Sequence, residues 1–302
     1  VRASCPFGPF AARRAFSADT HVIRFDPSHD KELEEGSRAH YREPLYYAKS
    51  YARRTEDVAY YRSLAVQDGG PILEYGCGAG RIALPIARQG IRVVGVDLSR
   101  EMLDAFRVRL KREPEAVRDN VRLVRGDMRS VRLRERFPLV LCTFNTLLHL
   151  YDRQDVERYL ARVHAHVTPR GRFVFDVSMP SAAELARDPN RAYRVPPMRW
   201  PATGQLVRYA EYFDYDPARQ ILYVTMHFEP VDDPQAAWST LLAHRQYQPR
   251  ELEALLHYNG FEVEQILSDF GPGPLDRYTD SAVWVARPRK RSSPSRRVPR
   301  PS

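Results

Sequence analysis

Apolar residues follow two periodicities between residues 71 and 178, and together they predict alternating strands and helices. Short apolar runs indicate strands that are buried on both faces, because helices cover both sides of a parallel sheet. These runs are residues 71–73, 91–96, 121–125, 137–143 and 172–178. Apolar residues at helical spacing between the runs predict helices at 82–87, 101–111 and 156–167. His164 and His166 are expected on the surface of the last helix.

The pattern changes between residues 179 and 248, where apolar and polar residues alternate. The alternating stretches are residues 205–215, 219–229 and 237–247. Alternation interrupted by turn residues predicts an antiparallel strand meander rather than another α/β crossover.

A helix is predicted at residues 249–258, where Asn259-Gly260 ends it, and the last two strands are predicted at 261–270 and 281–286. The fold class that follows is α/β. We expect a seven-stranded, mostly parallel sheet with an antiparallel β insert after the fifth strand.

Three glycines at alternate positions follow the first strand, and Glu74 stands at the end of that strand in the sequence Ile-Leu-Glu-Tyr-Gly-Cys-Gly-Ala-Gly-Arg (72–81). A strand, a glycine turn and a helix form the entry to a nucleotide-binding unit, because glycine lets the backbone approach a ligand. A dinucleotide fold has G-x-G-x-x-G, whereas this chain has E-x-G-x-G-x-G. The acidic residue would repel a pyrophosphate but suits a ligand that carries an ammonium group.

This motif resembles the first motif of class I S-adenosylmethionine (SAM) dependent methyltransferases, whose fold is Rossmann-like. The next two strands end in the same way, with Asp97 after residues 91–96 and Asp127-Met128 after 121–125. Ligands bind at the carboxyl ends of parallel strands, where Asp97 can accept hydrogen bonds from a ribose diol. The resemblance places Asp127 at the adenine amine and Glu74 near the methionine ammonium. Taken singly, Asp97 could cap a helix and Asp127 could stabilise a turn.

The resemblance covers residues 71–178 closely and 249–287 more loosely, and it implies SAM as the cofactor. The cofactor-binding residues that we predict are Glu74, Gly76, Cys77, Gly78, Arg81, Asp97, Leu98, Met102, Asp127, Met128 and Tyr51. Arg81 could meet the methionine carboxylate or lie exposed on the first helical turn.

His149 and Asn145 follow the fourth strand, where related enzymes bind the methyl acceptor. We predict both as catalytic residues, with a structural role for the histidine as the alternative. The signatures of two nucleic-acid methyltransferase classes are absent here, because Thr143-Phe144-Asn145-Thr146 replaces Asn/Asp-Pro-Pro-aromatic and Cys142 lies within the strand instead of following a proline. No group of His and Cys has metal-ligand spacing, so no metal is expected.

Composition and the resemblance together divide the chain into four segments: a poorly ordered or loosely docked extension (1–39), a helical lid (40–70), the methyltransferase domain (71–287) and a basic disordered tail (288–302). The resemblance implies that the insert at 179–248 shapes the acceptor pocket or forms a dimer contact. In the lid, Tyr46, Tyr47 or Tyr51 would face the ligand, and the alternative is that these tyrosines only pack onto the sheet. The tail holds six basic residues and no acidic ones, so its removal lowers the formal net charge from +9 to +3. A charge run of this kind is usually solvated.

Three functions remain open at this stage. The first is methyl transfer from SAM to a small-molecule amine or hydroxyl, with a homodimer as one expected assembly. The second is methylation of RNA or protein with help from the basic tail, and the third is SAM binding without turnover. Three cysteines and the absence of an apolar run of about 18 residues make a cytoplasmic location and no membrane contact the expectation.

Overall fold

The computed structural model describes residues 31–289. Most of the predicted N-terminal extension (1–30) and most of the predicted basic tail (290–302) lie outside the described residues. Within the described part, none of the helices is long and apolar enough to cross a bilayer.

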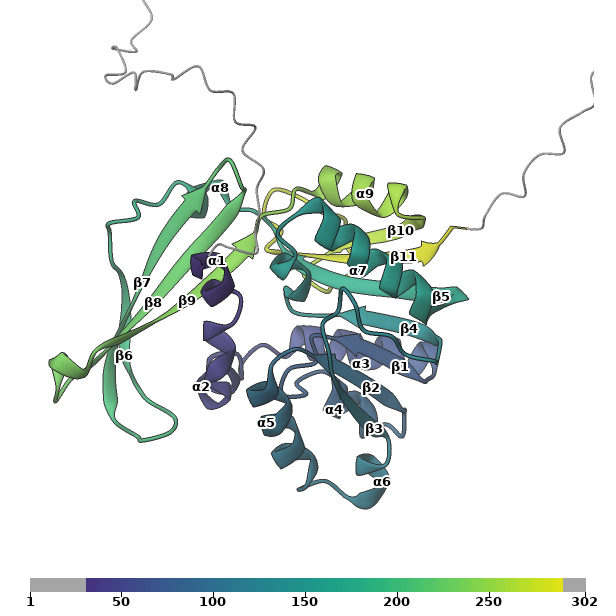
Figure 1. Ribbon diagram of the computed structural model, residues 1–302, viewed down its shortest axis with the longest axis horizontal. Helices are drawn as coiled ribbons and strands as arrows, with labels where there is room; N and C mark the ends of the chain where they lie inside the picture. Colours follow the sequence, from purple (N-terminus) through teal and green to yellow (C-terminus); the bar gives the residue numbers. More distant parts are fainter. Residues whose placement is uncertain (1–30, 290–302) are drawn as a thin grey trace, which may run out of the picture.

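A seven-stranded sheet forms the centre of the larger lobe, as the alternating pattern predicts (Figure 1). Its order is β10-β11-β5-β4-β1-β2-β3. Strands β1 to β5 run parallel, and β11 is antiparallel to both of its neighbours. The bounds are β1 Ile72–Tyr75, β2 Val93–Asp97, β3 Val121–Arg125, β4 Phe137–Cys142, β5 Val167–Ser178, β10 Phe261–Ser268 and β11 Ser281–Pro288.

Helices cover both faces of this sheet and divide its core into two clusters. Their bounds are α3 Glu56–Asp68, α4 Ala83–Ala87, α5 Arg100–Leu110, α6 Glu115–Arg118, α7 Arg153–His166 and α9 Pro249–Tyr258. Side chains of α7 and α9 pack with one set of strand residues, and side chains of α3, α4 and α5 pack with the alternate set. Leu73 and Tyr75 therefore join the first cluster and Ile72 the second, because successive strand residues point to opposite faces.

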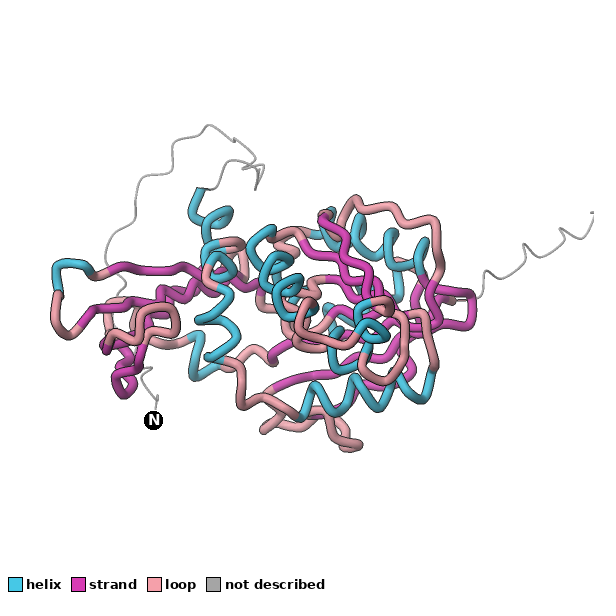
Figure 2. Tube along the Cα trace, turned by 90° about the horizontal axis from the view of Figure 1, so that it is seen from below, coloured by secondary structure: helices cyan, strands magenta, loops and turns pink. Residues whose placement is uncertain are grey.

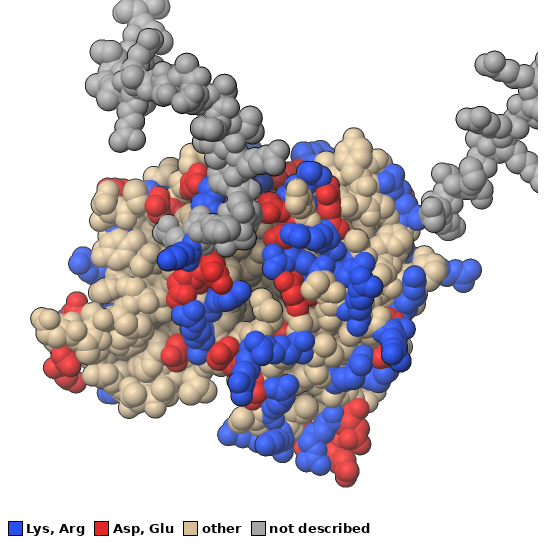
Figure 3. All heavy atoms as spheres, viewed as in Figure 1, with Lys and Arg blue, Asp and Glu red and all other residues tan. Residues whose placement is uncertain are grey.

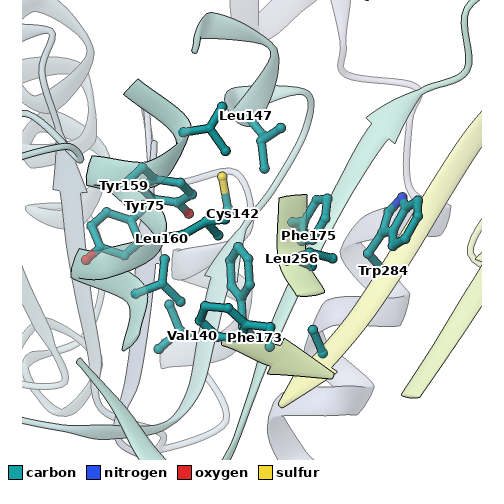
Figure 4. Packing of buried hydrophobic residues seen from close by; sticks show 14 of the residues in the cluster. Tyr75, Val140, Cys142, Leu147, Tyr159, Leu160, Phe173, Phe175, Leu256 and Trp284 are labelled. Carbon is teal, nitrogen blue, oxygen red and sulfur yellow. The ribbon is translucent and has the colours of Figure 1, made fainter. Parts of the chain in front are cut away.

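The first cluster is the one that Figure 4 shows, with Tyr75, Tyr159, Phe173 and Trp284 among its fully buried rings. His166, expected on the helix surface, is 2% exposed and belongs to this region, whereas His164 is exposed as expected. His166 Nε2 accepts a hydrogen bond from the Leu133 amide at 3.0 Å. The Nδ1–H of His166 therefore donates to the Tyr75 hydroxyl at 2.6 Å. The prediction for His166 was wrong because helical spacing alone does not locate a satisfied polar partner.

The antiparallel insert forms a separate sheet of order β6-β7-β8-β9 (Figure 2). The bounds are β6 Tyr193–Arg199, β7 Leu206–Asp216, β8 Ile221–Pro230 and β9 Trp238–Arg245, with α8 at Ala182–Leu185 and a short η4 turn at Pro234–Ala236. The predicted meander corresponds to β7, β8 and β9. The sequence pattern does not predict β6, because Pro196-Pro197 argues against a strand. Strand β6 accommodates the two prolines because it is an edge strand, and its register with β7 shifts between Val195 and Met198.

Three short helices lie between the two sheets (Figures 1 and 2). They are α1 Lys31–Gly36, η2 Ala39–Arg42 and α2 Pro44–Ser50. Leu33 of α1 is buried against Ile221, Tyr223 and Ala243, and a Cβ at Gly36 would lie 2.7 Å from that of Ala243. Residues 31–36, part of the predicted N-terminal extension, are therefore helical and contact the insert.

Candidate functional site

A cavity of about 1150 Å³ lies at the carboxyl ends of β1, β2, β3 and β4, and η2 and α2 supply its opposite wall. Two groups of lining residues differ in chemistry. We name the first the carboxylate half: Glu74, Gly76, Cys77, Gly78, Asp97, Leu98, Met102, Asp127 and Met128. We name the second the aromatic half: Tyr41, Tyr47, Tyr51, Phe144, His149 and Tyr151.

The glycine loop of the carboxylate half needs its glycines for two reasons. Gly76, Gly78 and Gly80 have φ of 67°, 51° and 77°, a region that side chains disfavour. A Cβ at Gly76 would also collide with the side chain of Thr146, which stands in the loop after β4. The amides of Gly76 and Cys77 both donate to the Val96 carbonyl, at 2.8 and 3.1 Å, so the loop is tied to the end of β2.

Asp97 completes that connection. Its Oδ2 accepts from the Gly78 amide at 2.7 Å and its Oδ1 from the Ser99 amide at 2.8 Å. Burial raises the pKa of Asp97, and these backbone donors act against that shift. Each carboxylate oxygen keeps a second lone-pair site, so Asp97 can hold the loop and still accept a hydroxyl group from the cavity. Ser99, not Asp97, caps helix α5 by accepting from the Met102 amide at 3.1 Å.

Glu74 has an unmatched oxygen at the bottom of the carboxylate half. It is 1% exposed, and its Oε1 accepts from the Thr143 hydroxyl at 2.9 Å. Its Oε2 is buried and has no hydrogen-bond partner among the described residues. Burial raises the pKa of Glu74 to about 8. A buried carboxylate oxygen without a donor is costly unless a ligand supplies one, so the site fits an ammonium group such as that of SAM.

Asp127 and Met128 line the cavity where β3 ends. Arg129 binds the Asp127 carboxylate through its Nη2 at 2.6 Å and also binds Asp155 through its Nη1 at 2.7 Å. Burial acts to raise the pKa of Asp127, but the bonds from Arg129 outweigh it and lower that pKa. The carboxylate is therefore fixed and ionised. Sequence reasoning missed Arg129 because nothing in the strand pattern marks it.

The aromatic half is held together by ring contacts and contains no carboxylate. The Phe144 ring lies 4.8 Å from that of Tyr51, and the Tyr51 ring lies 4.8 Å from that of Tyr47. Burial raises the pKa of Tyr51 to about 12 and that of Tyr47 further. Burial, and then the nearby His40, lowers the pKa of His149 to about 4. At neutral pH this half therefore carries no charge.

A chain of three hydrogen bonds fixes the tautomer of His149. The Tyr151 hydroxyl donates to the Ala243 carbonyl at 3.0 Å, so its oxygen must accept from His149 Nδ1–H at 3.1 Å. His149 Nε2 is then a lone-pair acceptor, and the Tyr41 hydroxyl donates to it at 2.6 Å. The Tyr41 oxygen keeps its own lone pairs free to accept a proton donor in the cavity.

Two predicted site residues have other partners. Asn145 is not among the lining residues, because its Oδ1 accepts from the Ser178 amide at 2.6 Å and its Nδ2 donates to the Ser178 hydroxyl at 2.8 Å. The geometry gives no support to a catalytic role for it. Arg81 lines the cavity but is paired with Asp57, with Nη1 to Oδ1 at 2.9 Å, and its guanidinium lies 4.3 Å from the Phe144 ring centroid.

The predicted lid contributes only in part. Tyr47 and Tyr51 line the cavity, but Tyr46 stacks on Trp200 at 5.1 Å in the core of the four-stranded sheet. Helix α3, the end of the predicted lid, packs on the seven-stranded sheet through Tyr61 and Leu64. Sequence reasoning also missed Tyr41 as a partner of His149, since 108 positions separate the two residues.

Residues 72–171 match a family model described as a methyltransferase domain. The cypemycin N-terminal methyltransferase of Streptomyces sp is 31% identical over 140 residues, which are 46% of this chain and 54% of that protein. The dTDP-3-amino-3,6-dideoxy-alpha-D-glucopyranose N,N-dimethyltransferase of Streptomyces fradiae is 33% identical over 123 residues, 41% of this chain and 45% of that protein. The chain thus spans about half the length of these curated relatives.

Similarity to solved structures extends further along the chain. The glycopeptide N-methyltransferase MtfA is 27% identical with a TM-score of 0.53, over 76% of this chain and 89% of that one. Structures of MtfA have been solved with SAM and with S-adenosylhomocysteine. The matched segment contains the glycine loop, Asp97 and Asp127, which form the carboxylate half. Residues 72–171 therefore match a methyltransferase domain, and the carboxylate half that they form fits SAM as the cofactor.

Proposed function

We propose that the protein transfers a methyl group from SAM to an amine of a small molecule that enters the aromatic half. The observation that carries this proposal is the hydrogen-bond chain of Tyr41, His149 and Tyr151. It presents a neutral hydrogen-bond acceptor, the Tyr41 oxygen, beside the carboxylate half, where the cofactor would bind. Three relatives whose names state N-methylation, one acting on a peptide N-terminus, one on an amino sugar and one on a glycopeptide, agree with an amine acceptor.

The residues divide the work by position. SAM supplies a methyl group on a good leaving group, so the protein mainly has to align the acceptor with it. Glu74 would hold the ammonium group, Asp97 the ribose hydroxyls and Asp127 the adenine amine. The Tyr41 oxygen would accept an N–H of the acceptor amine, which leaves the nitrogen lone pair directed into the cavity. After transfer, the methylated nitrogen keeps its extra proton until the product reaches solvent, because His149 with its lowered pKa is too weak a base to take it.

Uncharged surroundings favour a neutral acceptor. A buried imidazole whose pKa is about 4 and tyrosines whose pKa values are raised offer no counter-charge to an ammonium ion. The amine therefore has to enter as the free base, the only form with a lone pair for attack. A hydroxyl acceptor needs a stronger base to lose its proton, and His149 with its lowered pKa is a poor one.

The test is a comparison of matched acceptors. Purified protein would be incubated with isotope-labelled SAM and pairs of compounds that differ only in an amine or a hydroxyl at one position, beginning with amino sugars and short peptides. We expect label in the amines, and loss of the transfer in Tyr41→Phe but not in Tyr212→Phe, which lies outside the cavity. Transfer to the hydroxyl member alone would contradict the proposal.

Nucleic acid as acceptor has little support in the described residues. Figure 3 shows Lys and Arg interspersed with Asp and Glu over the larger lobe. Several of these arginines are paired, for example Arg88 with Glu113, and Arg92 and Arg122 with Glu135. Paired guanidinium groups release fewer counterions when they meet phosphates, so the surface gains little from RNA.

A further inference from the structure

The turn that follows β4 has a backbone conformation that its residues disfavour. Phe144 and Asn145 have φ of 53° and 63°, and neither is glycine. Two successive residues in the left-handed region persist only where surrounding groups hold them. Asn145 is held by its two hydrogen bonds to Ser178. Phe144 needs a comparable contact to keep its conformation.

Asp176 supplies that contact from β5. Its Oδ1 accepts from the Phe144 amide at 2.8 Å and from the Tyr61 hydroxyl at 2.6 Å. Asp176 is 3% exposed. Tyr61, its second partner, belongs to α3 and is fully buried. Burial raises the pKa of Asp176 to about 6. A buried carboxylate at the end of a strand, bonded to a disfavoured turn, is poorly explained by the stability of the sheet alone.

The conformation of the turn decides where the Phe144 ring lies. Arg81 stacks on this ring at 4.3 Å and Tyr51 meets its edge at 4.8 Å. The same loop contacts the carboxylate half, because the Thr143 hydroxyl donates to Glu74 and Thr146 fills the space beside Gly76. The ring is thus a wall of the aromatic half that stands next to the cofactor residues.

We propose that Asp176 is a positioning residue for methyl transfer: it holds the Phe144 amide, and through it the Phe144 ring, so that the acceptor is confined beside the cofactor. The role in confining the methyl acceptor rests on the proposed function. The hydrogen bond that Asp176 accepts from the Phe144 amide does not depend on it. Asp176 acts through Phe144 and is not among the residues that line the cavity.

Three variants separate positioning from simple structural support. Asp176→Ala removes the acceptor for the Phe144 amide. Asp176→Asn keeps a carbonyl oxygen in its place, and is the conservative rescue. Tyr61→Phe removes the other hydrogen bond to the same carboxylate but leaves the turn bonded, so it serves as the matched control. A melting curve for each variant defines a temperature at which all are folded.

Two readouts are measured at that temperature. The first is the fluorine resonance of 4-fluorophenylalanine placed at position 144, which needs no acceptor. We expect its chemical shift to change and its line to broaden in Asp176→Ala. In Asp176→Asn and Tyr61→Phe the resonance should keep the chemical shift and line width of the wild type. The second is turnover with an amine that the wild type methylates: Asp176→Ala should lower kcat about tenfold or more, as misplacement of reacting groups does, with little change in the Kd of SAM.

The outcomes test the positioning role of Asp176 separately from the proposed function. An unchanged resonance in Asp176→Ala, or equal losses of kcat in Asp176→Ala and Tyr61→Phe, would overturn the proposal. If the wild type methylates no amine, the resonance still shows whether Asp176 holds the turn, so a failure of the proposed function is distinguished from a failure of this one. A parallel loss of SAM affinity would assign Asp176 to the cofactor site instead.

Discussion

The two halves of the cavity are built from different kinds of chain segment and have opposite electrostatic character. The carboxylate half comes from the ends of three neighbouring parallel strands and contains three carboxyl groups, those of Glu74, Asp97 and Asp127. The aromatic half comes from η2, α2, the loop after β4 and its hydrogen bonds to β9, and its groups are neutral. Carboxyl groups in fixed positions commit the first half to one ligand, whereas rings and hydroxyls leave the second half free to differ between proteins of this fold.

The largest effect should follow from Asp97→Ala, which tests whether the carboxylate half is one unit. The variant would lose the proposed ribose contact, and it leaves the Gly78 and Ser99 amides without their acceptor. Hydrogen bonds to charged groups contribute about 1.5–3 kcal/mol each, so SAM affinity should fall about a hundredfold or more. Calorimetric titration with SAM measures it. Asp104→Ala, an exposed carboxylate on helix α5, is the control and should bind SAM normally.

The next effect concerns the aromatic half alone. His149→Ala removes the hydrogen-bond acceptor that orients Tyr41, and kcat/KM for the amine should fall about ten- to a hundredfold because the methyl acceptor loses its orientation. SAM affinity should not change if, as proposed, the two halves bind different ligands. Steady-state kinetics and calorimetry on one preparation measure both quantities. His227→Ala, on β8, is the control, and a fall in SAM affinity in His149→Ala would show that the halves are not separable.

A smaller effect tests the charge of Glu74. Because its pKa in the folded protein is about 8, the carboxyl is largely neutral at pH 6 and becomes a partner for ammonium as pH rises. SAM affinity should therefore increase up to about tenfold between pH 6 and 7.5, the range below the pKa of about 7.7–8.0 at which an α-amino group loses its own proton. Glu74→Gln should show a flat profile. A wild-type profile as flat as that of the variant would remove Glu74 from ammonium recognition.

The same group has an effect of known sign on stability. The pKa of Glu74 rises from its ordinary value of 4.5 on folding, so the folded state holds the proton more tightly. Its contribution to stability is therefore lost as pH rises from 4.5 to about 8. Glu74→Gln cannot ionise, and its melting temperature relative to wild type should be higher at pH 8 than at pH 5.

The smallest effect is expected from removal of residues 290–302. Neither half of the cavity includes a residue beyond position 151, so kcat/KM for a small amine should not change. A filter-binding assay with RNA at several salt concentrations gives the second measurement. Loss of methyl transfer together with loss of RNA binding would favour a nucleic-acid acceptor.

The contrast between the halves also explains what the sequence could predict. Glu74 and Asp97 lie at the ends of buried apolar strands and Asp127 lies two residues after β3, so a local pattern places them at one edge of the sheet. The seven-stranded fold follows from the same runs. Here one short window of sequence holds both the element and the functional residue.

The aromatic half could be predicted only in part, because long-range contacts assemble it. His149 was found from its position after β4, but its partners Tyr41 and Tyr151 depend on how η2 and β9 dock. Asn145 has an equally suggestive position, and only the structure shows that Ser178 occupies its side chain. No periodicity encodes such pairings, since the residues belong to different elements.

Strand β11 gives the chain a convenient point of attachment. Because it runs antiparallel to β5, Ser281 lies beside Ser178 at the cavity edge and Ala286 lies beside Phe173 at the other. Five residue steps of strand, about 17 Å, separate these two ends. A dye, an affinity handle or a surface linker joined after Arg289 would therefore leave the sheet on the side away from the cavity. Immobilised protein should keep its ligand entrance open to solution.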